Sequence, residues 1–136
     1  MRQVSVLEAK CASCGCLFGH PSLGDLAYGE AVLCTADGKH YATVDAWSGF
    51  SQGVMHLVKQ SGASLLWPVL ASLADPIAGQ PLTYSIRCPD CASDSLQYWG
   101  GQKAGTAQVP EATFISASTL SPIHLAERIG VSARQS

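Results

Sequence analysis

KCASCGC (residues 10–16) and RCPDCAS (residues 87–93) each contain one Cys-x-x-Cys unit. A turn with this spacing presents two sulfur atoms to one ion, and two such turns supply the four ligands of a tetrahedral structural zinc site. We therefore predict that one structural Zn²⁺ binds Cys11, Cys14, Cys88 and Cys91. A shell of four protein ligands leaves no coordination position for catalysis.

Both cysteine pairs are flanked by segments with strand character. VSVLEAK (4–10) leads into the first pair, while PLTYSIR (81–87) precedes the second pair and SLQYWG (95–100) follows it, so each pair is predicted at a hairpin tip. This arrangement resembles the zinc-ribbon class of zinc-binding domains, whose knuckles include the form Cys-Pro-x-Cys. Ala92 stands where that class often has glycine. The resemblance implies a zinc-binding module and no particular family.

The spacer between the two pairs is long for a ribbon, with 73 residues (15–87) between Cys14 and Cys88. Within it, Asp37-Gly38 lies between two β-rich runs, which predicts a hairpin with Cys34 opposite Tyr41 and Leu33 opposite Ala42. The spacer therefore has structure of its own and is expected to pack beside the ribbon.

Helices are predicted in the second half of the spacer. Apolar residues recur with helical spacing from Phe50 to Val58, with Ser48 as the N-cap and Gly62 just past the end. A second short helix is predicted to start near Pro68 and to stop at Asp75-Pro76. Trp47 and Trp67 flank the first helix and are predicted to lie in the core.

After the second pair, GGQKAGTAQ (100–108) has the composition of a turn and ATFISAS (112–118) that of a strand. A last helix is predicted from Ser121-Pro122, with Ile129 on its apolar stripe and Gly130 at its end. The predicted fold is one α+β domain over residues 1–136. Its zinc ribbon comprises residues 1–24 and 80–120, the inserted hairpin and helices residues 25–79, and the C-terminal helix residues 121–130.

Composition narrows the functional classes. Charged residues make up only 13% of the 136 residues and the formal net charge is −2, which does not fit a general polyanion binder. The start of the chain lacks the apolar stretch of a secretory signal, and the longest apolar run is interrupted by Pro68, so we expect a cytoplasmic protein without a membrane span. Thiols are expected to be reduced there.

Two cysteines remain outside the predicted site. Cys16 and Cys34 are interpreted as buried free thiols; the alternative is that Cys16 replaces a ligand or joins a second site with Cys34 and one histidine. The histidines available for such a site are His20, His40, His56 and His124.

Cations and aromatic residues accompany the two pairs. The residues that could contact nucleic acid or a protein partner are Lys10, Arg87, Tyr98, Trp99 and Lys103. The alternative for the two aromatic residues is that they cover a small core beside the metal. Eight basic residues scattered along the chain are few for a nucleic-acid binder.

The sequence gives little support for an enzymatic function. No His-x-Glu pair precedes the cysteines as a zinc deaminase needs, and no Gly-x-Ser-x-Gly, Walker or dinucleotide motif is present. We expect a zinc-stabilised, non-catalytic adaptor or subunit that docks onto a larger protein or nucleoprotein assembly. The alternatives are a nucleic-acid-binding zinc ribbon and, with least support, an enzyme whose site combines histidines with Cys34.

Overall fold

The computed structural model describes residues 1–23, 29–60 and 66–135, which form a mixed α+β fold, as predicted. The strands are β1 (Arg2–Cys11), β2 (Leu17–Ser22), β3 (Glu30–Thr35), β4 (Tyr41–Asp45), β5 (Leu82–Thr83) and β6 (Leu96–Val109). The helices are α1 (Gly49–Gln60), α2 (Leu66–Leu73), α3 (Ile115–Ser118) and α4 (Pro122–Gln135). Each described helix is too short or too polar to span a bilayer.

The first sheet has the strand order β2-β1-β6, and both pairings are antiparallel. The chain reverses between β1 and β2 through the first cysteine pair, with Lys10 opposite Leu17 as the last paired residues. This hairpin agrees with the sequence prediction. It places the first pair at the tip of the sheet.

The second sheet has the order β4-β3-β5, again antiparallel. The predicted hairpin register is confirmed, because Cys34 pairs with Tyr41 and Leu33 with Ala42. The reversal is closed by the Thr35 amide, which donates to the His40 carbonyl at 3.0 Å. Gly38 in this loop has a φ of 76°, a conformation that glycine adopts without steric cost.

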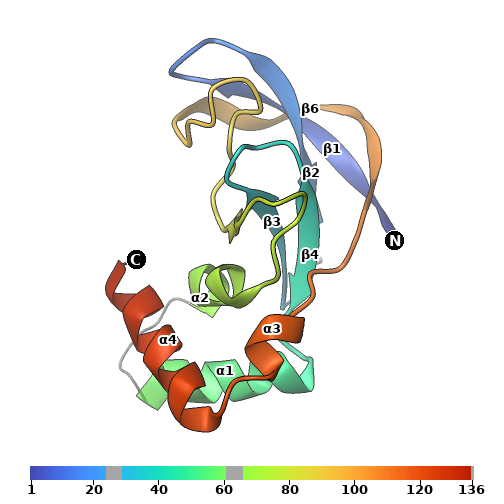
Figure 1. The fold of residues 1–136 in the computed structure, drawn as a ribbon. Coiled ribbons are helices and arrows are strands. Elements are labelled where there is room, and N and C mark those ends of the chain that lie inside the picture. Colours follow the sequence, from blue (N-terminus) through green and yellow to red (C-terminus); the bar gives the residue numbers. More distant parts are fainter. Residues whose placement is uncertain (24–28, 61–65, 136) are drawn as a thin grey trace.

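The second cysteine pair does not form the predicted hairpin. Within PLTYSIR only Leu82 and Thr83 form a strand, and they pair with β3 in the second sheet, whereas β6 pairs with β1 in the first. The second pair therefore connects the two sheets. In Figure 1 the two cysteine-bearing turns lie together, at the opposite end of the molecule from the helices.

The glycine-rich segment 100–108 is part of β6, so the prediction of a turn there is wrong. Its residues pair with β1, from Thr106 opposite Ser5 to Val109 opposite Arg2. Gly100 and Gly105 have positive φ values, and the register shifts along this pairing. Glycine here permits irregularities within a strand instead of ending it.

The hydrophobic core lies between the second sheet and the helices. The largest fully buried core side chains include Leu33 of β3, Val54 of α1, Leu70 of α2 and Ile129 of α4. α1 begins as predicted, because the Ser48 hydroxyl accepts a hydrogen bond from the Ser51 amide at 3.1 Å. The predicted helix end at Gly62 falls outside the described residues.

The two tryptophans beside α1 differ. Trp67 packs against the core cluster, as predicted. Trp47 is 70% exposed, so its predicted core position is wrong. Composition alone does not show which side of an element faces the core.

Two predictions for the C-terminal segment also differ from the structure. Residues 112–118 do not form a strand; Ile115–Ser118 form the short helix α3. α4 continues beyond Gly130 to Gln135. A single glycine costs a helix only about 1 kcal/mol relative to alanine, which the surrounding helix can absorb.

Candidate metal centre

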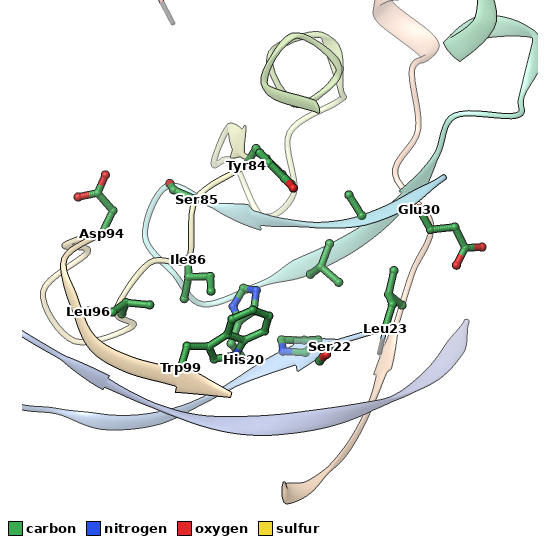
Figure 2. Close-up of a pocket in the computed structure, with 13 residues that line it drawn as sticks. His20, Ser22, Leu23, Glu30, Tyr84, Ser85, Ile86, Asp94, Leu96 and Trp99 are labelled. Atoms are coloured by element: carbon green, nitrogen blue, oxygen red, sulfur yellow. The ribbon is translucent and has the colours of Figure 1, made fainter. Parts of the chain in front are cut away.

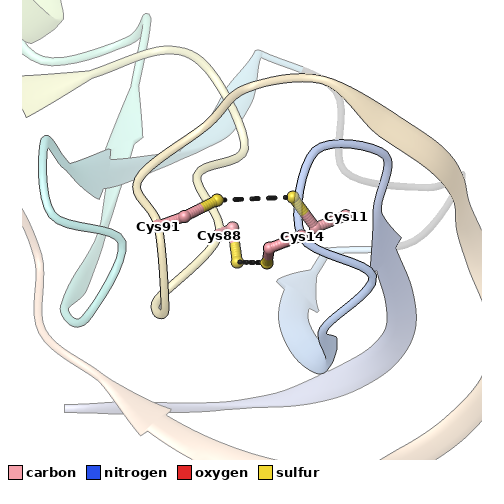
Figure 3. A group of neighbouring side chains, drawn as sticks. All are labelled: Cys11, Cys14, Cys88 and Cys91. Atoms are coloured by element: carbon pink, nitrogen blue, oxygen red, sulfur yellow. Dashed lines mark hydrogen bonds between the residues drawn. The ribbon is translucent and has the colours of Figure 1, made fainter.

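Four cysteines from the two turns converge on one point. The sulfur atoms of Cys11, Cys14, Cys88 and Cys91 all lie within 4.8 Å of one another. Figure 3 shows two close contacts between the turns: Cys11 Sγ lies 3.6 Å from Cys91 Sγ, and Cys14 Sγ lies 3.6 Å from Cys88 Sγ. The four residues predicted as ligands are therefore brought together, although 73 residues (15–87) separate the pairs.

The spacing of the sulfur atoms fits a tetrahedral ion. Zinc–sulfur bonds of about 2.3 Å at tetrahedral angles place neighbouring sulfur atoms about 3.8 Å apart. The observed separations, from 3.6 Å to within 4.8 Å, bracket that value. The cluster can hold one metal ion and is compatible with a zinc-ribbon-like site.

The first turn has a regular pattern of backbone hydrogen bonds. The Cys11 amide donates to the Cys16 carbonyl at 3.0 Å, and the Gly15 amide donates to the Cys11 carbonyl at 3.1 Å. The Ser13 amide donates to Cys11 Sγ at 3.3 Å. The turn thus holds the backbone of the cysteine pair in place and directs the Ser13 amide at the sulfur atom of Cys11.

The second turn repeats the same pattern. The Cys88 amide donates to the Ser93 carbonyl at 2.9 Å, the Ala92 amide donates to the Cys88 carbonyl at 2.8 Å, and the Asp90 amide donates to Cys88 Sγ at 3.4 Å.

The burial of the cysteines also matches between the two turns. Cys11 and Cys88 are buried, whereas Cys14 and Cys91 are exposed. The two turns are therefore equivalent in hydrogen bonding and burial.

Both turns end in a left-handed residue. Gly15 has a φ of 77° and Ala92, at the equivalent position, has a φ of 63°. Alanine in this conformation brings its Cβ close to the following carbonyl oxygen, at a cost of roughly 1–2 kcal/mol. The second turn keeps its shape in spite of this strain.

The shared thiols influence one another's acidity. The backbone amide of Cys14, which outweighs the other influences, lowers the pKa of Cys11 to about 6. The backbone amide of Cys16 lowers the pKa of Cys14, but partial desolvation of this exposed thiol and the neighbouring thiols together raise the pKa to about 12. The cluster favours the deprotonation of one thiol and disfavours the deprotonation of a second. All four thiols can therefore be deprotonated together only when a cation lies between the sulfur atoms.

Contacts outside the sulfur atoms hold the two turns together. The Ser13 and Ser93 hydroxyls lie 2.8 Å apart, and the Ala12 amide donates to the Ser95 carbonyl at 2.9 Å. Gly38 lies so close to the second turn that a Cβ would come within 2.6 Å of the Arg87 carbonyl oxygen. These supports join residues far apart in the chain, so no local sequence pattern predicts them.

Cys16 and Cys34 lie outside the four-sulfur cluster. Cys34 is fully buried on β3, which confirms the interpretation as a buried free thiol, and burial raises its pKa. Cys16 is half-buried. Its pKa is raised mainly by this burial and, to a smaller extent, by the nearby Cys88. Among the described residues, no second cluster of potential metal ligands includes either thiol.

The residues predicted to contact nucleic acid or a partner do not share one surface. Tyr98 lies opposite Lys10 and donates to the Glu8 carboxylate, whereas Trp99 lies opposite Ala9 and contacts the buried His20. Neighbouring residues of a strand point to opposite faces, so the two aromatic rings diverge. Lys103 lies farther along β6, opposite Leu7.

Arg87 has a local structural role. Its Nε donates to the Ser85 hydroxyl at 2.8 Å and Nη1 donates to the Ala92 carbonyl at 3.3 Å. These bonds tie the guanidinium to the second turn, where it supports the left-handed residue.

The four histidines lie on separate parts of the fold. His20 is buried on β2, His40 is exposed beside the β3–β4 loop and His56 is exposed on α1. His124 is exposed on α4, with its Nδ1 2.9 Å from the Ser121 hydroxyl. None of the four joins a metal-ligating group in the described part of the chain.

Comparisons of the chain with protein families, curated proteins and solved structures give no match. The class of site therefore rests on the four sulfur atoms and their turns.

Proposed function

We propose that the protein is a zinc-stabilised, non-catalytic adaptor that docks onto a larger protein assembly. The observation that carries the zinc assignment is the closed set of four sulfur atoms within 4.8 Å of one another. Four thiolates are the donor set typical of structural Zn²⁺, and they fill all of its tetrahedral positions. The ion then supports the fold and takes no part in a reaction.

The adaptor role is supported by uncovered apolar side chains at the helical end of the molecule. Ile115 of α3 and Ile123 of α4 are 71% and 72% exposed, and Trp47 before α1 is 70% exposed. Figure 1 shows α1, α3 and α4 gathered at this end, away from the cysteine-bearing turns. Exposed apolar groups of this size favour a protein partner.

Native mass spectrometry of the protein purified from the cells that produce it tests the proposal. We expect one zinc per chain and a stoichiometric complex with a second protein. The double variant Ile115→Ser/Ile123→Ser should lose the partner and keep the zinc. The matched control is Leu17→Ser, which changes an equally large side chain, 61% exposed, at the other end of the molecule.

Two results would reject the adaptor role: a chain that remains alone under gentle extraction, or a complex that survives in the double variant. Salt-dependent binding to random DNA or RNA would instead support the nucleic-acid alternative, because phosphate contacts weaken steeply with salt. The diverging rings of Tyr98 and Trp99 make that alternative less favourable. No histidine joins a group of potential metal ligands among the described residues, so the enzyme alternative has no supporting observation.

A further inference from the structure

A cavity of about 470 Å³ lies between the two sheets. Figure 2 shows its lining, which comes from β2, β3, β6 and the segments before and after the second cysteine pair. The lining includes His20, Glu30, Tyr84, Ile86, Asp94 and Trp99. Its volume and mainly apolar lining are those of a small-molecule site.

His20 lines this cavity and carries one buried ring nitrogen without a hydrogen-bond partner among the described residues. Its side chain is 3% exposed, and its Nδ1 has no hydrogen-bond partner among the described residues. Burial lowers the pKa of His20 to about 4, so the ring is uncharged at neutral pH. A buried polar atom without a partner costs about 1–3 kcal/mol, which a bound group could recover.

Aromatic rings surround the imidazole. Trp99 lies edge-on to His20, with ring centroids 5.6 Å apart and an interplanar angle of 86°. Trp99 and Tyr84 both line the cavity and remain 43% and 48% exposed. Part of each ring is therefore available to pack against a planar guest.

The charges at the cavity disfavour an anion. Glu30 and Asp94 contribute carboxylates, and no lysine or arginine is among the described lining residues. Arg2 neutralises Glu30 through a 2.7 Å ion pair, which leaves Asp94 as the remaining charge. The remaining carboxylate repels an anion and permits an uncharged ligand.

The cavity also depends on the metal centre. Ile86 lies just before Cys88 and Asp94 just after Cys91, and Leu96 begins the strand that leaves the second turn. The segments that hold the second pair are therefore also walls of the cavity.

We propose that this cavity binds an uncharged, planar heteroaromatic molecule of one or two fused rings, whose polar ring edge hydrogen-bonds to Nδ1 of His20 and whose face packs on Trp99. The site is independent of the adaptor role. A ring edge that carries adjacent N–H and C=O groups can donate a hydrogen bond to Nδ1 in one tautomer of the imidazole and accept one from Nδ1 in the other.

The test uses the full, zinc-loaded chain and three probes of similar size. 2-Quinolinone carries the adjacent N–H and C=O, naphthalene carries no polar group, and 2-naphthoate is an anion. Titrations are followed through the indole N–H signals of the three tryptophans in ¹⁵N-labelled protein. We expect 2-quinolinone to shift the Trp99 signal saturably and to leave the Trp47 signal in place, since Trp47 does not line the cavity.

Naphthalene should bind at least about tenfold more weakly than 2-quinolinone, because it leaves Nδ1 unpaired. 2-Naphthoate should bind more weakly than 2-quinolinone as well. Two variants at position 20 separate the hydrogen bond from the packing. His20→Phe keeps a ring and should abolish the preference for 2-quinolinone, whereas His20→Asn keeps a polar atom near the place of Nδ1 and should retain part of it.

The proposal is overturned if 2-quinolinone leaves the Trp99 signal unchanged up to its solubility limit. It is equally overturned if naphthalene binds as tightly as 2-quinolinone, or if His20→Phe keeps the preference. Should both variants fail to fold, the comparison of the probes on the unmodified chain still decides the outcome.

Discussion

Ala92 and Gly15 occupy the same position in the two cysteine-bearing turns, and both have positive φ values. No atom lies within 4 Å of a Cβ placed on Gly15, so a side chain there meets only backbone strain. Opposite substitutions at the two positions should therefore change stability in opposite directions.

We expect Ala92→Gly to stabilise the zinc-loaded protein by about 0.5–1 kcal/mol, since relief of left-handed strain exceeds the added entropy of the unfolded chain. Gly15→Ala should destabilise it by about 1 kcal/mol. Urea unfolding measures both. A loss of stability in Ala92→Gly would show that the strain assignment is wrong.

The buried imidazole of His20 should make stability depend on pH. Its pKa falls from 6.5 to about 4 on folding because of burial. Between these values the unfolded chain binds a proton that the native chain does not bind. His20 thus contributes full stability above pH 6.5, and this contribution is lost as the pH falls toward 4.

Compared with His20→Phe, the unmodified protein should lose up to about 3 kcal/mol of unfolding free energy between pH 6.5 and pH 4. Denaturant unfolding at several pH values gives this difference, in which acid effects common to both proteins cancel. Parallel pH profiles for the two proteins would contradict the buried, neutral imidazole.

Individual residues differ in how readily the sequence predicts them. The four cysteines are predictable because each pair is a local motif with a fixed spacing. The unpaired Nδ1 of His20 is not, because its burial depends on β6 and on Tyr41, whose ring centroid lies 5.1 Å away.

At the scale of the elements, α3 forms where the local pattern predicts a strand. The Asp75 carboxylate accepts hydrogen bonds from the Thr113 hydroxyl at 2.7 Å and from the amides of Ile115 and Ser116 at 2.7 and 3.0 Å. These bonds lower the pKa of Asp75 to about 2, and the hydrogen bond from Thr113 is the largest cause. A residue about 40 positions earlier thus satisfies the first amides of the helix.

Removing this cap should weaken the C-terminal segment. Asp75→Ala is expected to cost about 1–2 kcal/mol of unfolding free energy, because it leaves the helix amides without their acceptor. Glu127→Ala on the exposed side of α4 is the matched control and should change stability by less than about 0.5 kcal/mol. Equal effects in urea unfolding would refute the capping role.

β6 is a second element whose structure the local sequence pattern does not predict. Its glycines predict a turn, yet Val4 to Leu7 of β1 provide the hydrogen-bonding partners that keep the segment extended. The β3–β4 hairpin was predictable in register because both of its strands and its turn lie within sixteen consecutive residues, 30–45.

At the scale of the whole molecule, the proposed zinc joins parts of the chain that no short motif connects. The first turn lies within one sheet, and the second turn connects β5 of the other sheet to β6. The predicted long-range contact between the pairs was accessible from sequence because two Cys-x-x-Cys turns are the ligand set typical of one structural zinc ion. The path by which the second turn crosses between the sheets was not accessible, since it depends on where β5 and β6 find their partners.

Zinc sites of this kind contribute about 10–16 kcal/mol of binding free energy in zinc-finger peptides, as much as the whole stability of a small domain. Loss of the ion should therefore separate the turns and unfold the chain. It should also destroy the cavity, whose walls include Ile86 and Asp94 from the segments that flank the second pair.

The most direct test is thermal unfolding followed by far-ultraviolet circular dichroism, on zinc-loaded protein and on protein treated with a strong chelator under reducing conditions. We predict that chelation abolishes the cooperative transition and much of the secondary structure, and that added zinc restores both. If mass spectrometry confirms that the metal has left, yet the spectrum and the Tm are unchanged, the four cysteines do not form a structural zinc site on which the fold depends.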